Sequence, residues 1–202
     1  MINAENITLL LAAYMFGSIP SAVWIGKVFF NTDVREYGSG NAGATNTFRV
    51  LGPKAGVPVL LMDIAKGWIA VQLATYFGEY MPATQQFINF KLTLGAAALL
   101  GHIFPVFAGF RGGKGVATLL GILWGVNPPA AVICMGVFLL FFLTTGYVSL
   151  GSMAAAVSFP FIVMWWLNET VTSMNVFAIA VPILVLITHQ KNIERILKRT
   201  ES

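Results

Sequence analysis

Apolar residues occur along this chain in long continuous runs that are separated by short polar segments. The runs cover Ile7–Ile25, Val57–Phe77, Leu92–Phe110, Val116–Val126, Ala130–Leu143, Val148–Leu167 and Val176–Ile187. A helix needs about 20 residues to cross the hydrocarbon core of a bilayer, and several runs reach that length. The alternating segments of about ten residues that are typical of a membrane β-barrel do not occur. The pattern therefore predicts an all-α integral membrane protein, a polytopic helical bundle.

The number of spans depends on the shorter runs. Between Gly115 and Gly146 the apolar pieces fit tilted helices, half-helices or one broken span, so the pattern supports five to seven spans. Composition supports the membrane prediction, because only 10% of the 202 residues are charged, whereas soluble domains carry about 25%. We expect residues 1–202 to form a single transmembrane domain, with seven helices as the preferred arrangement.

The few charged residues predict the orientation. With seven spans and an external N-terminus, 11 of the 12 basic residues fall on one side, and Lys91 is the exception. Glu5, Glu79 and Glu169 fall on the other side. The positive-inside rule makes the basic side cytoplasmic, so the C-terminus is expected in the cytoplasm. We attribute the net charge of +4 to this topology and expect no nucleic-acid binding.

A glycine-rich stretch lies in the first long polar connection, residues 27–54, which we expect in the cytoplasm. It reads GSGNAGATN, and an arginine follows three residues later. Backbone N–H groups, hydroxyls and amides at this density suit a phosphate, and arginine binds phosphate with two parallel hydrogen bonds. The predicted ligands are Gly38, Ser39, Gly40, Asn41, Gly43, Thr45, Asn46 and Arg49. A glycine-rich turn that binds no ligand is the alternative.

The same glycines formally match the dinucleotide-binding pattern G-x-G-x-x-G, and Asp63 lies 20 residues beyond the last of them. That pattern requires a buried strand before the glycines and a βαβ unit after it. Here the preceding TDVREY is polar, and Asp63 lies in a run of membrane length. We therefore reject the nucleotide interpretation.

A second motif, RGGKG, lies at the expected start of a helix. Helix N-termini present unpaired N–H groups and the positive end of the helix dipole to anions. We predict phosphate contacts from Gly112, Gly113, Lys114 and Gly115. The motif is not a Walker A loop, because glycine follows the lysine. A positive-inside anchor in an ordinary loop is the alternative, and we expect the preceding His102 to be packed and hydrogen-bonded.

The remaining polar residues lie in the basic tail, residues 188–202, and in the second apolar run. His189 and Asn192 are three residues apart, which places them on one face of a helix, and we expect both to turn inward. Asp63 and Lys66 have the same spacing within an apolar run. For this pair, a functional site and an internal ion pair are both open.

Together these residues resemble the bacterial acyl-phosphate:glycerol-3-phosphate acyltransferase family, PlsY. The resemblance rests on four motifs: GSIPSAVWIGK (Gly17–Lys27), GSGNAGATNTFRVLG (Gly38–Gly52), GHIFPVFAGFRGGKGVAT (Gly101–Thr118) and HQKNIERI (His189–Ile196). It implies seven transmembrane helices in the bacterial inner membrane and an active site that faces the cytoplasm. It also implies transfer of a fatty acyl group from acyl phosphate to the 1-hydroxyl of sn-glycerol 3-phosphate. The products are lysophosphatidic acid and phosphate, and no metal or other cofactor takes part.

The resemblance also implies roles for individual residues. Catalytic roles are implied for Ser39, Arg49, Lys114, His189 and Asn192. A glutamate near the C-terminal end of the family corresponds to Glu201, although Arg199 stands where that motif usually has glycine. The expected partners are glycerol 3-phosphate, acyl phosphate, membrane lipids and the soluble enzyme that makes acyl phosphate.

The expected chemistry needs no covalent intermediate, because acyl phosphate is a mixed anhydride with a good leaving group. Arg49 and Lys114 are expected to offset the charge of the two phosphates. The proton of the attacking hydroxyl passes either to His189 or to the phosphate of glycerol 3-phosphate, whose second pKa is about 6. An organophosphate transporter and an acyl-CoA-dependent acyltransferase are the alternative functions. The transporter is disfavoured, because no internal repeat is evident in the sequence.

Overall fold

The computed structural model describes residues 3–82 and 84–201. Its α-helices are α1 (Ala4–Gly17), α2 (Ser21–Phe30), α3 (Ala44–Leu51), α4 (Pro53–Phe77), α5 (Gln85–Ile103), α6 (Val116–Val126), α7 (Pro128–Thr145), α8 (Val148–Phe161), α9 (Thr172–Thr188) and α10 (Gln190–Leu197). Two short 3-10 helices, η1 (Val34–Glu36) and η2 (Val106–Ala108), and a π-helix, η3 (Ile162–Trp166), are also present. These residues contain no strand, which confirms the all-α prediction. Contacts divide the chain into two compact units, Met1–Val126 and Asn127–Ser202.

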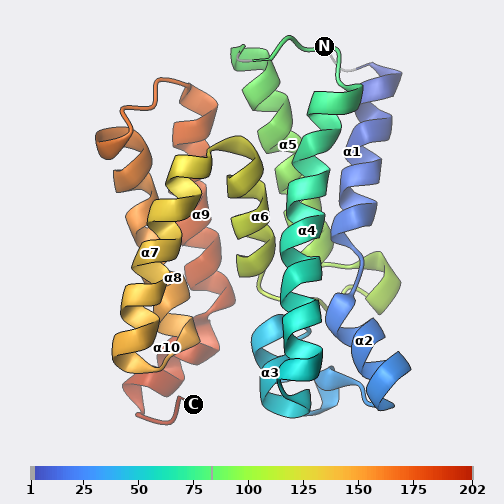
Figure 1. Ribbon diagram of the computed structural model, residues 1–202, viewed down its shortest axis with the longest axis vertical. Coiled ribbons are helices and arrows are strands. Elements are labelled where there is room, and N and C mark those ends of the chain that lie inside the picture. Colours follow the sequence, from blue (N-terminus) through green and yellow to red (C-terminus); the bar gives the residue numbers. More distant parts are fainter. Residues whose placement is uncertain (1–2, 83, 202) are drawn as a thin grey trace. The chain divides into compact units, whose positions relative to one another are not determined.

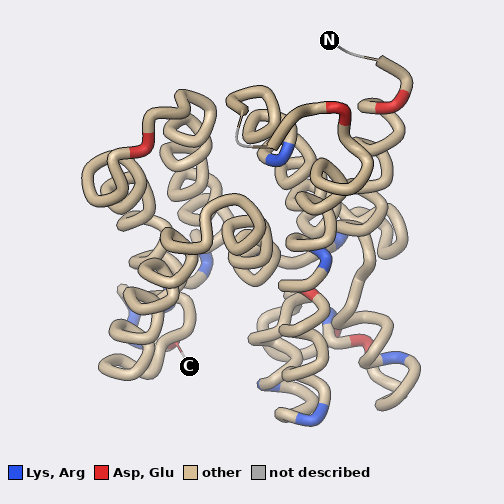
Figure 2. Tube along the Cα trace, turned by 45° about the horizontal axis from the view of Figure 1, so that its top comes forward, with Lys and Arg blue, Asp and Glu red and all other residues tan. Residues whose placement is uncertain are grey.

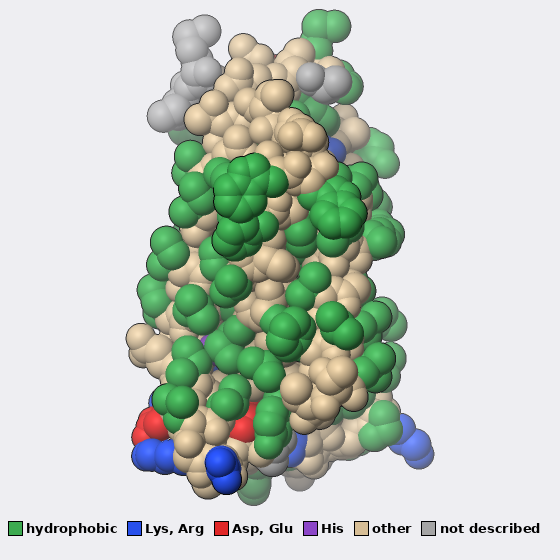
Figure 3. Space-filling view, turned by 90° about the vertical axis from the view of Figure 1, so that its left-hand side faces the viewer, with side chains coloured by type: hydrophobic (Ala, Val, Ile, Leu, Met, Phe, Trp, Pro, Cys, Tyr) green, Lys and Arg blue, Asp and Glu red, His purple; other side chains and the backbone are tan. Residues whose placement is uncertain are grey.

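Several helices in the described residues can cross a membrane. Four elements are each long and apolar enough: α4, Gln85–Ala108, α7 and Val148–Trp166. Two bent pairs qualify when each is taken as one span, α1 with α2 at 43° and α9 with α10 at 62°. The described chain thus has four to six such spans by length and composition, and α6 is a shorter apolar helix. On the face shown in Figure 3, hydrophobic side chains cover most of the height and most charged side chains gather at one end.

The structure refines two of the predicted apolar runs. The run Ile7–Ile25 is broken, because α1 ends at Gly17 and α2 begins at Ser21. Pro20 lies in the break, where it lacks the N–H that a continuing helix would need. Within the ambiguous region after Gly115, α7 has 18 residues and is long enough to be a span by itself.

In the first unit, α1, α4 and α5 lie side by side, and α6 packs along α4 (Figure 1). Helices α2 and α3 lie at one end of this unit, next to the start of α4 (Figure 1). The core between α1, α4 and α5 contains small residues such as Ala13, Ala70 and Ala98. Small side chains allow helices in a membrane to approach closely. Most Lys and Arg residues of this unit lie toward the end that holds α2 and α3 (Figure 2).

Helix α6 lies beside the middle of α4 rather than beside its start. A β-carbon on Gly67 would overlap the carbonyl oxygen of Thr118, and one on Gly121 would overlap that of Ile64. These glycines therefore allow direct contact between the two helix backbones. Near the end of α6, Lys91 Nζ donates a hydrogen bond to the carbonyl oxygen of Gly125 over 3.0 Å. The basic residue that the predicted topology leaves on the outer side thus caps a helix C-terminus.

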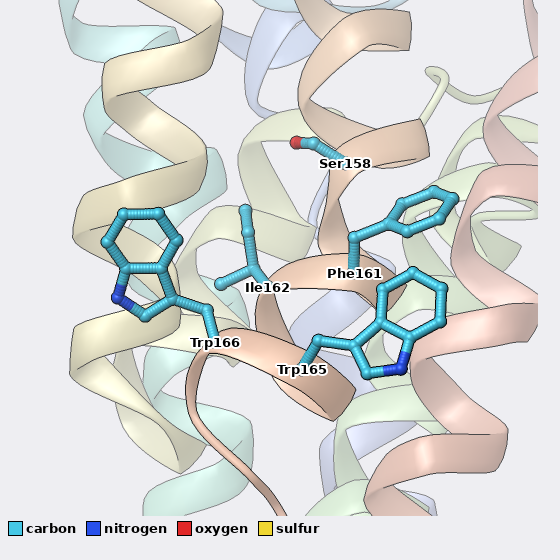
Figure 4. A pocket seen from close by; sticks show the side chains of 5 residues that line it. All are labelled: Ser158, Phe161, Ile162, Trp165 and Trp166. Atoms are coloured by element: carbon cyan, nitrogen blue, oxygen red, sulfur yellow. The ribbon is translucent and has the colours of Figure 1, made fainter.

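The second unit contains α7, α8 and α9, with α8 in contact with both of the others. Helix α8 contains Pro160 and continues as the π-helix η3, since proline removes a helical hydrogen bond. An apolar hollow of about 500 Å³ lies at this point and is lined by Ser158, Phe161, Ile162, Trp165 and Trp166. The indoles of Trp165 and Trp166 point to opposite sides (Figure 4). The centroids of the Phe161 and Trp165 rings are 5.0 Å apart. The lining carries no charge, so this hollow is unsuited to phosphate.

Helix α9 ends at Thr188. His189 is the C-cap of α9 and also the N-cap of α10. The two helices are bent by 62° at this point. His189 therefore lies at the bend and outside both helices, whereas Asn192 lies in the first turn of α10, where its backbone N–H donates to the carbonyl oxygen of His189 over 2.8 Å. Both side chains are nevertheless buried, as expected.

Candidate active site

The first glycine motif forms a tight loop that is held by Asn46. The Asn46 Oδ1 accepts a hydrogen bond from the backbone N–H of Ser39 over 2.8 Å. Its Nδ2 donates to the carbonyl oxygens of Val34, at 2.7 Å, and Tyr37, at 3.2 Å. The side chain is only 2% exposed. Asn46, a predicted phosphate ligand, uses both polar atoms of its amide to fix the shape of the loop.

Two glycines allow this loop to turn. Gly38 and Gly40 have φ values of +60° and +71°, in the left-handed region where a β-carbon is strained. A β-carbon on Gly38 would also overlap the Asn46 Oδ1. The loop therefore requires glycine for its own conformation, and this requirement accompanies any role in binding a ligand.

Helix α3 follows the loop directly and presents two of the predicted ligands. Gly43 caps the helix, and Thr45 and Arg49 are four residues apart, so they lie on the same face. Both are exposed, whereas Asn46 and Thr47 between them are buried. Ser39 and Asn41 in the loop are partly exposed. The hydroxyl of Thr45 thus lies at the surface in the first turn of α3, where an anion is favoured, and the guanidinium of Arg49 lies on the same face in the last turn.

The second glycine motif is hydrogen-bonded to the end of α5. The backbone N–H of Gly113 donates to the carbonyl oxygen of His102 over 3.1 Å, and that of Gly112 donates to Ile103 over 3.2 Å. Gly115 has a φ of +87°, and its carbonyl oxygen accepts the first hydrogen bond of α6 from Leu119. Lys114, which is partly exposed, therefore lies immediately before a helix N-terminus, as the sequence predicts.

The two glycine motifs are direct neighbours in the first unit. The backbone N–H of Ala42 donates to the carbonyl oxygen of Gly112 over 3.4 Å. A second connection runs from Arg35, whose Nη1 donates to the carbonyl oxygen of Ala108 over 2.8 Å. The structure thus brings together two loops that lie some 70 residues apart in the sequence.

An ion pair next to the first motif strengthens this connection. Asp33 accepts hydrogen bonds from Arg35 Nε at 2.9 Å and Arg35 Nη2 at 2.7 Å, and Lys27 Nζ lies 3.2 Å from Asp33 Oδ2. The guanidinium of Arg35 holds the pKa of the Asp33 carboxyl well below its usual range. The carboxylate in turn raises the pKa of Arg35. Sequence reasoning missed this pair, although a D-x-R spacing beside the glycine motif was visible.

The predicted residues of the second unit lie where α9 meets α10. His189 is 3% exposed, and its Nδ1 lies 2.8 Å from the carbonyl oxygen of Val185. A carbonyl can only accept, so Nδ1 carries the proton and Nε2 holds the lone pair of the neutral ring. Asn192 Nδ2 donates to Glu201 Oε1 over 2.5 Å, and Ser149 Oγ donates to the same oxygen over 2.8 Å. Glu201 therefore joins α8 to α10, in spite of the Arg199 that departs from the family pattern.

Within the first unit, the pair Asp63 and Lys66 is an ion pair, with 2.8 Å between Asp63 Oδ1 and Lys66 Nζ. His102 is buried beside it, as expected, but its Nδ1 forms no hydrogen bond within the described residues, which differs from the predicted hydrogen-bonded histidine. Among residues 3–82 and 84–201, no group of three His, Cys, Asp or Glu side chains is placed to hold a metal ion. The first unit thus contains two glycine loops, the Asp33–Arg35 ion pair and the buried Asp63–Lys66 ion pair.

Comparison with known proteins identifies the family. A sequence model described as glycerol-3-phosphate acyltransferase matches residues 7–199, a range that runs through both units. This chain belongs to the glycerol-3-phosphate acyltransferase family. The resemblance drawn from the four motifs is therefore confirmed.

Curated members of the glycerol-3-phosphate acyltransferase family align over nearly the full chain. The protein from Enterococcus faecalis is 46% identical over 97% of this chain and 90% of its own length. The protein from Chlorobaculum tepidum is 39% identical over 97% of this chain and 95% of its own length. The protein from Listeria monocytogenes is 45% identical over 94% of this chain and 92% of its own length.

Solved structures of this family have the same fold. A crystal structure of PlsY, an integral membrane glycerol 3-phosphate acyltransferase in its glycerol 3-phosphate form, matches with a TM-score of 0.86 at 38% identity. It covers 98% of this chain and 95% of that chain. The lysophosphatidic acid form matches with a TM-score of 0.82 at 37% identity, over the same shares. The chain is thus similar to an integral membrane acyltransferase throughout its length.

Proposed function

We propose that this acyltransferase takes its acyl group from acyl phosphate and transfers it to the 1-hydroxyl of glycerol 3-phosphate. The observation that carries the proposal is the hydrogen bond from Ala42 to Gly112, which joins the two glycine loops. Arg49 follows one loop and Lys114 lies in the other. The reaction must hold two phosphates near one another, and two cations offset their repulsion.

In this proposal the hydroxyl oxygen attacks the carbonyl carbon of acyl phosphate and forms the ester bond. The bond from that carbon to the bridging phosphate oxygen breaks, and inorganic phosphate leaves with the electron pair. The products are lysophosphatidic acid and phosphate. Ser39, Arg49 and Lys114 hold the phosphates with Thr45 and Asn41. The backbone N–H groups of Gly40, Gly112 and Gly113 already donate to carbonyl oxygens of the protein, so these glycines shape the loops.

The hydroxyl proton needs an acceptor, and we retain two. The orientation of His189 through Val185 leaves its Nε2 as the basic nitrogen, which supports a role as base or as a hydrogen-bond acceptor. The phosphate of glycerol 3-phosphate has a second pKa of about 6 and is the other acceptor. Asn192 and Glu201 then keep His189 and the start of α10 in place.

An assay with two acyl donors tests the proposed function. Purified protein is incubated with labelled glycerol 3-phosphate and either acyl phosphate or acyl-CoA of the same chain length. We expect labelled lysophosphatidic acid with acyl phosphate only. Formation of lysophosphatidic acid with acyl-CoA only would show that the donor is acyl-CoA and not acyl phosphate. Uptake of glycerol 3-phosphate into vesicles that contain the protein, without any lysophosphatidic acid, would indicate a transporter.

We also propose seven spans in the bacterial inner membrane, formed by the four long elements, the two bent pairs and α6, with the glycine loops facing the cytoplasm. The test uses a Cys134→Ala background, since Cys134 is the only cysteine. Into this background we introduce one cysteine at an exposed position, by Lys54→Cys or by Glu79→Cys. Intact cells that express each variant are treated with a membrane-impermeant maleimide. Residue 79 should react from outside and residue 54 only after permeabilisation; the opposite pattern would invert the topology.

A further inference from the structure

A buried group of charged residues lies in the first unit and has no part in the proposed chemistry. Asp63, Lys66 and His102 are between 2% and 5% exposed. Asp63 Oδ1 lies 2.8 Å from Lys66 Nζ and accepts a hydrogen bond from Ser21 Oγ over 3.0 Å. Burying charges is costly, and replacing such a pair by apolar residues is often neutral or stabilising. Ionisable residues inside membrane helices therefore call for a functional explanation.

Asp63 and Lys66 form hydrogen bonds with residues at the break between α1 and α2. Lys66 Nζ donates to the carbonyl oxygen of Ile19 over 3.0 Å. Ser21, the first residue of α2, is the residue that donates to Asp63. The pair on α4 thus fixes the position at which the first span bends.

On the other side, His102 connects the pair to the RGGKG loop. His102 Nδ1 lies 3.7 Å from Asp63 Oδ1, farther than a hydrogen bond, so the imidazole edge packs beside the carboxylate. The opposite edge of the ring faces Gly113, where a β-carbon would overlap His102 Nε2. The carbonyl oxygen of His102 also accepts the N–H of Gly113. Both the ring and the backbone of His102 therefore determine where the residue before Lys114 lies.

We propose that Asp63, Lys66 and His102 are positioning residues for the phosphate-binding loops. The ion pair orients the imidazole, and the imidazole sets the backbone of Gly113 and so the direction of Lys114. Because Ala42 donates to the carbonyl oxygen of Gly112, the same constraint reaches the first glycine loop. This inference rests on the proposed function, since it assigns Lys114 to a phosphate.

The first test separates positioning from stability. Asp63→Asn leaves Lys66 buried without its anion, so we expect a lower melting temperature in detergent and a lower kcat/KM. The double variant Asp63→Asn with Lys66→Met removes both charges. Its melting temperature should recover, while kcat/KM with glycerol 3-phosphate stays low by on the order of 100-fold, the cost of a catalytic group displaced by about 1 Å. Recovery of both quantities would show that the pair acts on stability alone and would overturn the proposal.

The second test uses the contact between His102 and Gly113. His102→Ala and Gly113→Ala each disturb one side of it, so their effects on kcat/KM should be non-additive, and the double variant should be no worse than the poorer single variant. Gly95→Ala is the matched control: it lies on the same helix as His102, and its β-carbon would meet Ile122 Cγ2 at 2.8 Å, on α6 and about two helical turns beyond Lys114. It should lower the melting temperature and leave kcat and KM of the folded protein unchanged. Additive effects, or a His102→Ala enzyme with unchanged kcat and KM, would contradict a positioning role.

Binding of glycerol 3-phosphate, measured by calorimetry on the same variants, distinguishes the two proposals. If the wild type binds glycerol 3-phosphate and forms no lysophosphatidic acid, the proposed function fails. The positioning role is then still tested, because His102→Ala should weaken that binding and Gly95→Ala should not. Equal binding by both variants would overturn the positioning role whatever the reaction.

Discussion

Asn46 Oδ1 accepts a hydrogen bond from the backbone N–H of Ser39 over 2.8 Å, and this contact closes the first glycine loop. The same amide donates to two carbonyl oxygens, those of Val34 and Tyr37. One buried side chain thus holds together the loop that carries most of the predicted phosphate ligands.

Asn46→Asp is the most informative change at this position. It keeps an acceptor for Ser39 but sets an oxygen against the carbonyl oxygens of Val34 and Tyr37. We expect a lower melting temperature, since each such hydrogen bond contributes about 1 kcal/mol, and a kcat/KM at least on the order of tenfold lower. Thr32→Ala, in the same connection, is the control. Wild-type activity of Asn46→Asp would show that the loop does not depend on this amide.

Arg49→Ala and Lys114→Ala should each abolish turnover, because each removes a cation that offsets phosphate charge. Arg49→Lys should recover only part of the activity, since lysine lacks the two-pronged geometry of arginine. Lys54→Ala removes an exposed basic residue from the same end of the unit and should be close to wild type. The measurement is the rate of lysophosphatidic acid formation at saturating substrate, with size-exclusion chromatography as the check on folding. Substantial turnover by Arg49→Ala would remove it from the site.

His189→Gln and His189→Ala distinguish two roles for this residue. Glutamine provides hydrogen-bonding groups but cannot act as a general base at neutral pH. If the substrate phosphate accepts the proton, Gln should retain most of kcat and Ala should lose it. Loss of kcat in both variants, with an unchanged KM, would make His189 the base.

Glu201→Ala should separate the ends of α8 and α10, because Glu201 Oε1 accepts from both Asn192 and Ser149. Glu201→Gln keeps an oxygen acceptor and should be milder in melting temperature and in kcat. Ser149→Ala removes one of the two hydrogen bonds and should lie between the wild type and Glu201→Ala. If Gln is as damaging as Ala, the negative charge is required rather than the acceptor.

Asp33→Asn tests the ion pair with Arg35 through its pH dependence. The pKa of the Asp33 carboxyl is lower in the fold than its value of about 3.9 in an unfolded chain. The stabilisation is therefore complete above that unfolded value and is lost as the pH falls through the folded pKa. The wild type should melt above Asp33→Asn at pH 7, and the difference should shrink below about pH 4. A difference that is constant with pH would show that the charge of Asp33 is not involved.

Hydropathy predicted the helices well, because each apolar run must be buried in lipid or protein. It did not predict where spans bend. Pro20 marks the break before Ser21 in the sequence, but the contact that holds this bend, from Lys66 to Ile19, and the contact of the His189 ring with Val185 at the second bend come from the fold. The partners in such contacts are far apart in the sequence or are backbone groups, so the hydropathy of an apolar run does not predict them.

The candidate site could be predicted by residue type but not by partner. Glycine spacing indicated two anion loops, and the structure places them side by side. The sequence could not show that the Asn46 amide is occupied within the loop, since its partners are backbone groups. It also could not pair Glu201 with Ser149, which lies 52 residues away, or His102 with Asp63.

In the proposed reaction, the short length of α6 sets the depth at which the substrates meet. Through His102, the RGGKG loop lies at the level of Asp63, about 15 Å along α4 from Pro53 at 1.5 Å per residue. The 25 residues of α4 are longer than the hydrocarbon core of about 30 Å, so Pro53 lies outside the core and the loop lies part of the way into one leaflet. Glycerol 3-phosphate then has to descend from the water, while acyl phosphate reaches the loop without withdrawing its chain from the bilayer. A full-length sixth span would move the loop to the surface and require the lipid substrate to be lifted out.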